Sequence, residues 1–439
     1  MDPRPTSGGD TIVALASGAG VAAVAVVRVS GPGTRAVLEN LIGSAPVPRE
    51  ASLRRIGGID RGLVLWFPGP ASFTGEDMAE LQVHGGRAVV KAVVEAVLAT
   101  EGTRLAEPGE FARRAFENGK LDLTEVEGLA DLVSAETEAQ RRQALAQSEG
   151  GLRRLYEGWR AELLKAQSLM EAGLDFSDEA DVAEDATRMA GDVVGALLPK
   201  IEAHLADKSG ERLRDGFRVV IAGPPNAGKS SILNALAKRD VAIVSEEAGT
   251  TRDVIEVHLD IGGMPVIVAD TAGLREGGGA VESEGIRRAV SRAQGADLVL
   301  WIVDAAEPNP EAAPGFGGVP VLSVTNKSDL VSRSAAGSTS GVTMSAKTGE
   351  GLEALIAELG QRAGAGIGAH CAAPITRTRH RVELVSVRDA LKRFVNHDLD
   401  SELRAEELRI AAHHLGRLTG RIDVEEVLGA IFSEFCIGK

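Results

Sequence analysis

A glycine-rich segment with one lysine and one serine is the clearest set of residues here that could do chemistry. Gly223 to Ser230 reads GPPNAGKS and matches the phosphate-binding pattern G-x-x-x-x-G-K-[ST]. The β-like run Arg218–Ala222 precedes it and the helical run Ser231–Ala237 follows it, which is the context that the pattern requires. Backbone N–H groups can bind the α- and β-phosphates, Lys229 can contact the β- and γ-phosphates, and Ser230 can bind Mg²⁺. The segment therefore predicts a nucleoside triphosphate site.

A second motif, Asn326-Lys327-Ser328-Asp329, follows the β-like run Val321–Thr325 and indicates the base. The Asp329 carboxylate can accept hydrogen bonds from guanine N1–H and from the exocyclic N2 amine. Adenine lacks that amine and has an acceptor at N1, so the contact discriminates strongly between the two bases. Ser345-Ala346-Lys347 follows where GTPases have another base-contacting loop, although this short motif is weak by itself. The two motifs predict that GTP is bound rather than ATP.

Two segments between these motifs could contact Mg²⁺ and the γ-phosphate. Asp270-Thr271-Ala272-Gly273 follows the β-like run Val266–Ala269, and its acidic residue can organise the Mg²⁺ shell. A simple turn is the alternative, but the position one strand after the phosphate loop favours function. Gly249–Asp253 reads GTTRD, and a threonine hydroxyl there could complete the Mg²⁺ shell. A polar loop is the alternative, although the motif order favours a switch segment.

Hydrolysis of GTP in such a site needs a group that orients the attacking water. Leu274 follows Gly273 at the place where Ras-like GTPases have a glutamine, and leucine cannot hydrogen-bond a water. Glu282 lies in the nearby segment Gly277–Glu284. From the residues alone, a solvated surface glutamate and a catalytic one both remain open, with the former favoured.

The hydrophobic pattern predicts three kinds of region. Residues 1–121 mix the β-like runs Ala22–Val29, Gly62–Phe67 and Ala79–Val83 with one helical run, Ala88–Thr100. Residues 122–215 and 366–439 are helical, and residues 216–365 alternate β-runs with helices, which is typical of a doubly wound parallel sheet. The simplest interpretation is an N-terminal α+β domain followed by a helical domain into which a Ras-like P-loop domain is inserted.

Local signals add five expectations. The apolar run Ile12–Val27 is predicted to be a buried strand region, and Thr124 with Glu127 is predicted to form a capping box. Asp423 and Glu426 form a similar pair, and Ser332–Gly341 is a predicted loop. A helical stripe is expected to form a bundle core; its members are Leu152, Leu155, Trp159, Leu163 and Met170.

Composition excludes several classes of function. The 439 residues carry a formal net charge of -15 at pH 7, which argues against a broad basic face for nucleic acid but leaves room for a local basic patch. Two cysteines, Cys371 and Cys436, are too few for a disulfide scaffold or for a zinc site without other ligands. The first ten residues lack the order of a signal peptide and no run suits a membrane span, so a cytoplasmic location is expected.

Several further segments carry a resemblance to a known family. The chain resembles the tRNA-modifying GTPase family MnmE, also called TrmE, along essentially its whole length. The segments that carry the resemblance are Arg28–Pro32, Ser72–Asp77, His84–Gly86, Pro108–Phe111, Arg114–Phe116, Asn118–Leu123, Pro225–Ser231, Ala248–Asp253 and Phe435–Lys439. Many of them are typical of this family rather than of GTPases in general.

The resemblance implies an N-terminal folate-binding and dimerisation domain, a central helical domain and an inserted G domain. It implies a homodimer that works with the FAD-binding partner MnmG (GidA), in a heterotetramer or larger complex, on tRNA. The expected product carries an aminomethyl-type group at C5 of the wobble uridine, position 34. The expected cofactors are GTP, Mg²⁺, K⁺ and a reduced folate, either 5-formyl- or 5,10-methylene-tetrahydrofolate.

Site residues also follow by position from the resemblance. Folate contacts would be Arg28, Glu80, Lys120 and Lys439; K⁺ ligands would be Asn226, Ser245, Glu247 and Thr250; and Mg²⁺ ligands would be Ser230 and Thr251. Glu282 aligns with the catalytic glutamate of the family. The GTP-binding set would be Asn226, Ala227, Gly228, Lys229, Ser230, Ser231, Ser245, Glu246, Glu247, Ala248, Gly249, Thr250, Thr251, Asp270, Thr271, Ala272, Gly273, Asn326, Lys327, Asp329, Ser345, Ala346 and Lys347.

Some features depart from the family or keep a simpler interpretation. The segment Ser17–Ala23 lacks the arginine of the usual Pro-Gly-Arg-Gly-Gly loop, which leaves its contact with folate or a dimer mate open. Ser245 stands where many members have threonine. Arg28 at a strand end is often a solvated cap, and His84 is more often structural than catalytic. Cys436 as a nucleophile would need a lowered pKa, and only Lys439 offers a nearby charge in the sequence.

Overall fold

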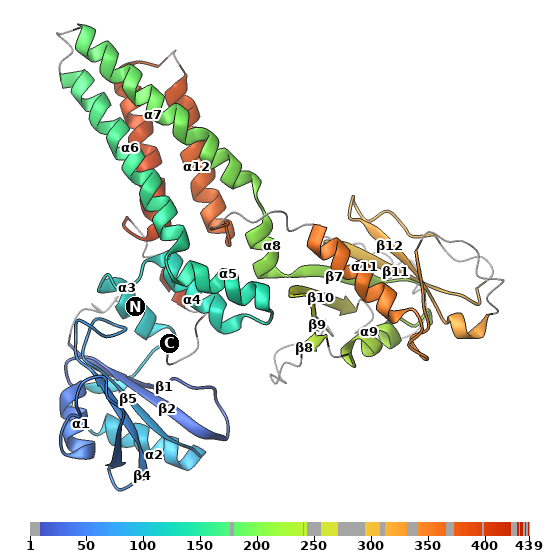
Figure 1. Ribbon diagram of the computed structural model, residues 1–439, viewed down its shortest axis with the longest axis horizontal. Coiled ribbons are helices and arrows are strands. Elements are labelled where there is room, and N and C mark those ends of the chain that lie inside the picture. Colours follow the sequence, from blue (N-terminus) through green and yellow to red (C-terminus); the bar gives the residue numbers. More distant parts are fainter. Residues whose placement is uncertain are drawn as a thin grey trace, which may run out of the picture. The chain divides into compact units, whose positions relative to one another are not determined.

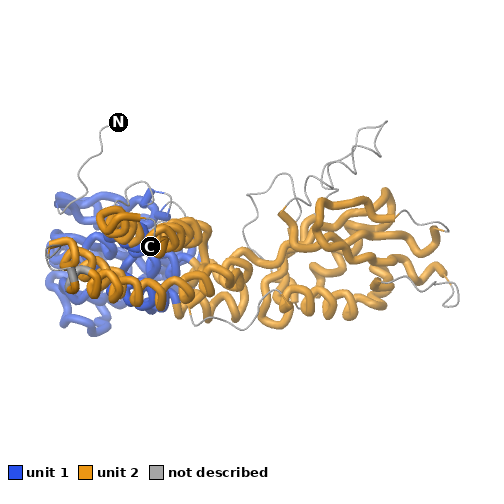
Figure 2. The backbone as a smooth tube through the Cα atoms, turned by 90° about the horizontal axis from the view of Figure 1, so that it is seen from above, with its two compact units in different colours: residues 1–130, 147–161, 412–439 blue, residues 131–146, 162–411 orange. Residues whose placement is uncertain are grey.

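The structure is a computed structural model (Figure 1). It describes residues 9–175, 180–239, 241–243, 256–270, 295–307, 312–331, 341–365, 373–396, 399–422, 428–429, 431–432, 435 and 438. The chain divides into two compact units, which Figure 2 colours separately. Unit 1 comprises residues 1–130, 147–161 and 412–439, and unit 2 comprises residues 131–146 and 162–411.

Unit 1 is built on a six-stranded sheet with the order β3-β4-β5-β2-β1-β6. The strands are β1 (Thr11–Leu15), β2 (Ala22–Ser30), β3 (Ser52–Ile56), β4 (Asp60–Phe67), β5 (Met78–Gly85) and β6 (Thr103–Leu105). All neighbouring strands are antiparallel except β6, which runs parallel to β1. The predicted run Ile12–Val27 is therefore two strands, and the exposed turn between them includes Val21, which is 82% exposed. Gly18 and Gly20 break the apolar pattern there.

Helices α1 (Thr34–Ile42) and α2 (Arg87–Leu98) cover one face of this sheet. Alternate residues of β2 and β5, such as Val27 and Leu81, are fully buried against them. Because side chains alternate across a strand, Arg28 and Glu80 belong to the opposite face. The sequence missed α1 and β3, since both carry many polar residues.

Helices α3 (Glu110–Glu117) and α4 (Leu123–Ser134) continue unit 1 and pack with the C-terminal segment. Phe432 and Phe435 are buried with Leu123 and Val126 of α4. The predicted capping box at Thr124 and Glu127 is wrong by two residues. Asp122 caps the helix instead, because its Oδ1 accepts from the Glu125 N–H while the Glu125 carboxylate accepts from the Asp122 N–H.

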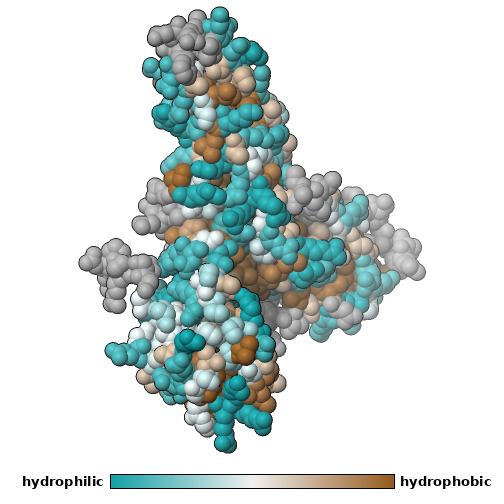
Figure 3. Space-filling view, turned by 60° about the vertical axis from the view of Figure 1, so that its left-hand side comes forward, coloured by the Kyte–Doolittle hydropathy of each residue, from teal (hydrophilic) through white to brown (hydrophobic). Residues whose placement is uncertain are grey.

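Further helices outside the two sheets are α5 (Glu138–Ser148), α6 (Gly151–Asp175), α7 (Ala180–Ala206), α8 (Ser209–Asp215), α12 (Thr378–Val395) and α13 (Ser401–Thr419). Leu152, Trp159, Leu163 and Met170 of the predicted stripe are buried; Leu155 is only half-buried, and Tyr156 takes the inward position beside it. The visible surface of the helices is largely hydrophilic (Figure 3), as expected for amphipathic helices. Among the described helices, none is long and apolar enough to cross a membrane.

Unit 2 also contains a seven-stranded sheet with the order β13-β12-β11-β7-β10-β9-β8. Its strands are β7 (Phe217–Ala222), β8 (Ala242–Ile243), β9 (Glu256–Ile261), β10 (Met264–Asp270), β11 (Leu298–Asp304), β12 (Val321–Asn326) and β13 (Val342–Thr343). Strands β10, β7, β11, β12 and β13 are parallel, and β9 and β8 extend the sheet antiparallel. Helices α9 (Lys229–Ala237) and α11 (Leu352–Ala365) pack on its core, so the predicted fold class is confirmed.

Candidate functional site

The phosphate loop lies at the carboxyl end of β7, the strand from which the parallel order extends in both directions. Ligands bind at such a switch point in open α/β sheets. Gly228 is the left-handed residue (φ 92°) before α9, and Asn226 also has a positive φ of 60°. A Cβ at Gly223 would lie 2.3 Å from the Ile302 carbonyl oxygen of β11. Glycine at this position therefore lets the loop pass close to the neighbouring strand.

The Lys229 ammonium group folds back onto this loop. It donates hydrogen bonds to the carbonyl oxygens of Gly223 and Pro224, both at 2.9 Å. Lysine is a flexible point charge, and these carbonyl contacts hold it at the loop that the sequence predicts to bind phosphates. The first turn of α9 carries Ser230 and Ser231, which are both exposed.

The side chain of Asn326 forms hydrogen bonds that connect three of the predicted motifs. Its side chain is 1% exposed, and its Nδ2 donates to the Ala227 carbonyl oxygen of the phosphate loop at 3.0 Å. Its Oδ1 accepts from the Ala346 N–H, also at 3.0 Å. A Cβ at Gly228 would lie 2.3 Å from Asn326 Nδ2, so the loop approaches this side chain too closely for any other residue. The hydrogen bonds of Asn326 thus connect the phosphate loop with both predicted base-contacting motifs.

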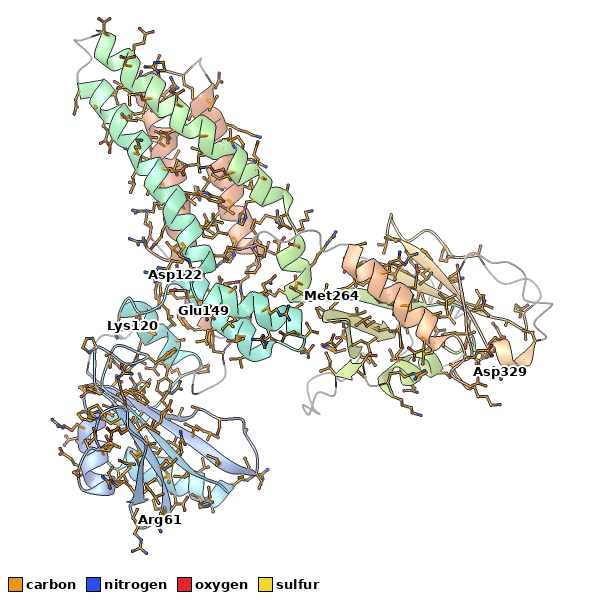
Figure 4. The ribbon with its side chains drawn as sticks, viewed as in Figure 1. Arg61, Lys120, Asp122, Glu149, Met264 and Asp329 are labelled. Carbon is orange, nitrogen blue, oxygen red and sulfur yellow. The ribbon has the colours of Figure 1, made fainter. Side chains whose placement is uncertain are left out.

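Asp329, which the sequence predicts to contact the base, is held in place by a buried serine. Its Oδ1 accepts a 2.6 Å hydrogen bond from the hydroxyl of Ser345, which is fully buried and accepts in turn from the Thr348 N–H. Asp329 itself is exposed, at the edge of the sheet in Figure 4. A carboxylate fixed on one oxygen and open on the other is suited to accept hydrogen bonds from guanine.

Lys327 has a partner that the sequence did not reveal. Its ammonium lies 2.6 Å from Asp304 Oδ2 at the end of β11, and the other Asp304 oxygen accepts from the Ala306 N–H. Burial raises the pKa of Asp304, but the hydrogen bond from Lys327 and that from Ala306 outweigh burial and hold this pKa below its usual value. An acidic residue at the carboxyl end of a parallel strand is the signal that could have identified Asp304.

In unit 1, Arg28 and Glu80 are direct neighbours on β2 and β5. Arg28 Nη2 lies 2.8 Å and Nε lies 3.2 Å from Glu80 Oε1. The Arg28 guanidinium is also within 5.6 Å of the ring centre of Phe73 and 5.7 Å of that of Phe111. The pair is half-buried, with side-chain exposures of 20% and 18%. Two residues that the resemblance assigns to folate therefore form one site with two aromatic rings.

Lys120 and the end of the chain reach the same region. The Lys120 ammonium donates to the Pro70 carbonyl oxygen at 2.9 Å, in the loop 68–77 that carries Phe73. Gly438 has a φ of 105°, and a Cβ there would lie 2.1 Å from the Leu15 carbonyl oxygen. Leu15 pairs with Val27 in the sheet, next to Arg28. Lys439 lies outside the described residues, but its neighbour Gly438 lies against the end of β1, the strand that pairs with β2.

A partly buried ionic cluster that the sequence did not predict contacts the loop 68–77. Glu76 of the loop accepts from Arg114 at 3.1 Å and from the Ser30 hydroxyl at 2.9 Å. Arg114 also contacts Asp10 and Glu110, and Arg104 contacts the same two carboxylates. Glu110 and Arg114 are an i,i+4 pair on α3 that the sequence could have indicated, but Asp10 and Glu76 are distant in the sequence and no local pattern connects them to the cluster.

Other predicted residues lie outside the described part of the chain. They are Ser245, Glu246, Glu247, Ala248, Gly249, Thr250, Thr251, Thr271, Ala272, Gly273, Leu274, Glu282, Asp423, Glu426, Cys436 and Lys439. Most of the predicted loop Ser332–Gly341 also lies there. Asp270 is the last residue of β10, which pairs with β7, the strand that precedes the phosphate loop.

The fold and the first site define a P-loop nucleotide-binding protein. Two family profiles match the chain: "GTP-binding protein TrmE N-terminus" over residues 11–120 and "MnmE helical domain" over residues 123–436. The chain is 53% identical to the "tRNA modification GTPase MnmE" of Parvibaculum lavamentivorans over 450 residues, which cover 98% of this chain and 100% of the relative. The protein of the same name from Paramagnetospirillum magneticum is also 53% identical, over 98% of this chain and 100% of its own length.

Among solved structures, the G domain of the T. maritima FeoB iron transporter is 25% identical, covers 33% of this chain and 98% of its own, and has a TM-score of 0.24. The two profiles together span nearly the whole chain, and the relatives match it from end to end. This chain belongs to the MnmE family of tRNA modification GTPases, so the predicted family and the predicted GTPase activity are confirmed.

Proposed function

We propose that this GTPase supports the addition of an aminomethyl-type group at C5 of the wobble uridine, position 34, of tRNA. In this proposal it works with the FAD-binding partner MnmG, and a reduced folate supplies the one-carbon unit. The observation that carries the proposal is the Arg28–Glu80 pair with its two aromatic neighbours, present in the same chain as a preformed guanine site.

The proposed GTP site consists of the phosphate loop and the two base-contacting motifs that Asn326 connects. Asp329 accepts from the guanine edge, Lys229 contacts the β- and γ-phosphates, and the hydroxyls of Ser230 and Thr251 bind Mg²⁺. The positive φ at Asn226 and Gly228, with the close approach of Asn326, fits a loop that wraps an anion with its backbone. The bound nucleotide supplies the phosphoryl group that is transferred to water.

K⁺ is proposed to assist hydrolysis. Asn226 is exposed beside the phosphate loop, and its side chain has no hydrogen-bond partner among the described residues. Its amide oxygen is free to coordinate a cation with Ser245, Glu247 and Thr250, and Glu282 acts on the attacking water. A cation there adds positive charge where an arginine finger otherwise acts.

The proposed folate site is the region around Arg28. Arg28 and the two lysines, Lys120 and Lys439, would pair with the carboxylates of the folate glutamate, while Glu80 would accept from the nitrogens of the pterin ring. The rings of Phe73 and Phe111 provide apolar surface beside these charges. Arginine between two aromatic rings and a carboxylate fits a flat, polar-edged ligand better than a purely apolar one.

The proposed assembly follows the family. Residues 1–121 form the folate-binding and dimerisation domain, residues 122–215 with 366–439 form the helical domain, and residues 216–365 form the inserted G domain. The protein acts as a cytoplasmic homodimer that joins MnmG in a heterotetramer or larger complex. What supports this division is the chain order of the two sheets and the helices between them.

Calorimetry with 5-formyl-tetrahydrofolate tests the folate site. The wild type is expected to bind, and Glu80→Ala is expected to bind at least roughly tenfold more weakly, because a charged hydrogen bond contributes about 1.5–3 kcal/mol. Glu95→Ala is the matched control, since Glu95 is 64% exposed on α2 and its one ion pair among the described residues is with Lys91. Absence of binding by the wild type, or equal affinity in both variants, would remove the proposed site.

A further inference from the structure

The hairpin of β3 and β4 places two arginines directly opposite each other. The register pairs Arg55 with Arg61, and the next pair on the same face is Leu53 with Leu63. Both arginines are exposed, and β3 is the edge strand of the sheet. Figure 4 shows Arg61 at the free end of unit 1, directed into solvent. Arg54 of the same strand is also exposed, but it pairs with Gly62 and therefore projects from the opposite face of the hairpin.

These arginines have no carboxylate partners in the described part of the chain. Asp60 is the nearest acidic residue in the hairpin, but it is engaged by other groups. It accepts from the backbone N–H of Arg61 at 2.7 Å and of His84 at 2.8 Å, and His84 Nδ1 lies 2.9 Å away. Arg28, Arg104 and Arg114 in the same unit each contact at least one carboxylate. The guanidiniums of the hairpin are therefore left uncompensated.

Like charges directly opposite each other in a sheet destabilise it. The fold does not need the Arg55–Arg61 pair, because two exposed positions on an edge hairpin accept many polar residues. A bound anion would remove the repulsion and satisfy both guanidiniums at once. The pair is therefore better explained by an anionic ligand than by folding.

We propose that the hairpin arginines Arg55 and Arg61 bind the phosphate backbone of tRNA. This proposal rests on tRNA as the substrate of the family. The chain has a net charge of -15, so RNA is repelled from most of its surface. The Arg55–Arg61 pair, which has no free carboxylate beside it, is a place where phosphates can approach. A hairpin at the exposed edge of a sheet is accessible to an extended polyanion. Contacts between its arginines and phosphates would position the RNA without reading its sequence.

Binding of a fluorescent tRNA transcript to the full-length protein tests the proposal, measured by anisotropy at several KCl concentrations. Arg55→Ala/Arg61→Ala should weaken binding about tenfold for every tRNA tested. It should also reduce the slope of log K against log salt by about 0.7–0.9 for each arginine. Arg61→Lys keeps the charge and should keep the slope. Arg141→Ala/Arg142→Ala is the matched control, because both arginines pair with Glu138 and should not affect binding.

Melting temperature and GTP turnover without tRNA separate binding from folding. In Arg55→Ala/Arg61→Ala the melting temperature should be equal or slightly higher, because the variant removes a repulsion, and GTP turnover should be unchanged, because the hairpin lies outside the G domain. Wild-type affinity or an unchanged salt slope in this variant would overturn the proposal, as would loss of MnmG binding with normal tRNA binding. If the wild type binds no tRNA but still restores the wobble modification in cells, the hairpin proposal fails and the proposed function stands.

Discussion

The guanine site and the Arg28 site differ in how the chain builds them. Asn326, Asp329 and Ser345 belong to short motifs that follow parallel strands, and hydrogen bonds among them hold the guanine site together without ligand. The Arg28 site collects residues from β2, β5, the loop 68–77, Lys120 and the chain end. One site is specified locally by sequence motifs, and the other exists only because the N-terminal sheet brings distant residues together.

The two sites also differ in what a ligand must displace. At the guanine site, Asp329 is exposed and one of its oxygens faces no described partner, so a base can bind without breaking an ion pair. At the Arg28 site, the arginine and Glu80 already satisfy each other. A folate that uses both groups must compensate for this ion pair, and we expect that site to bind its ligand with a larger rearrangement of side chains.

The largest effect is expected for Asp329→Asn. The amide presents a donor to the guanine edge, and the hydroxyl of Ser345 loses a charged acceptor. GTP affinity should fall roughly 100-fold or more, because unpaired polar groups in a base contact discriminate strongly. Affinity for xanthosine triphosphate should rise, since its C2 carbonyl accepts from the new amide. Nucleotide titration measures both, with Asp297→Asn at the other end of β11 as the control.

A second prediction concerns the cation beside the guanine site. GTP turnover should be roughly tenfold or more faster in KCl than in NaCl at equal ionic strength, because the cation replaces an arginine finger. Asn226→Ala should remove this difference while nucleotide affinity changes little. Equal turnover of the wild type in the two salts would eliminate K⁺ from the account.

At the Arg28 site, Arg28→Ala should weaken binding of reduced folate roughly tenfold, through loss of charged hydrogen bonds of about 1.5–3 kcal/mol. It should leave GTP turnover unchanged if the two sites bind their ligands independently. Calorimetry and a phosphate-release assay on the same preparation measure the two effects. A variant with normal folate affinity would place the folate elsewhere.

The smallest effect is expected for Asp304→Asn. This residue positions Lys327 rather than contacting the base, and the ion pair is partly exposed, so GDP affinity should fall only roughly 2- to 5-fold. In a Lys327→Ala background the same substitution should have no further effect, which a double-mutant cycle measures. Additive losses from the two substitutions would show that Asp304 acts independently of Lys327.

The contrast between the sites also explains what could be predicted from the sequence. The doubly wound fold and the guanine motifs follow from strand–loop–helix patterns, and the structure adds the contacts of Asn326 with Ala227 of the phosphate loop and with Ala346. The partner of Lys327 was missed because Asp304 is a lone acidic residue in a different strand. The contacts of Arg114 with Asp10 and Glu76 depend on tertiary distances, which hydrophobic periodicity does not contain. The cap at Asp122 is local, and it was missed because Thr124 with Glu127 offers the same spacing two residues later.

In the proposed function, the guanine site and the Arg28 site both serve one tRNA modification. The direct measurement is mass spectrometry of wobble uridine in tRNA from a deletion strain that expresses the wild type, Asp329→Asn or Glu80→Ala. The account predicts that the wild type restores the C5-modified uridine and that each variant fails although its protein is present at normal levels. Full modification with Glu80→Ala, or none with the wild type, would contradict the account.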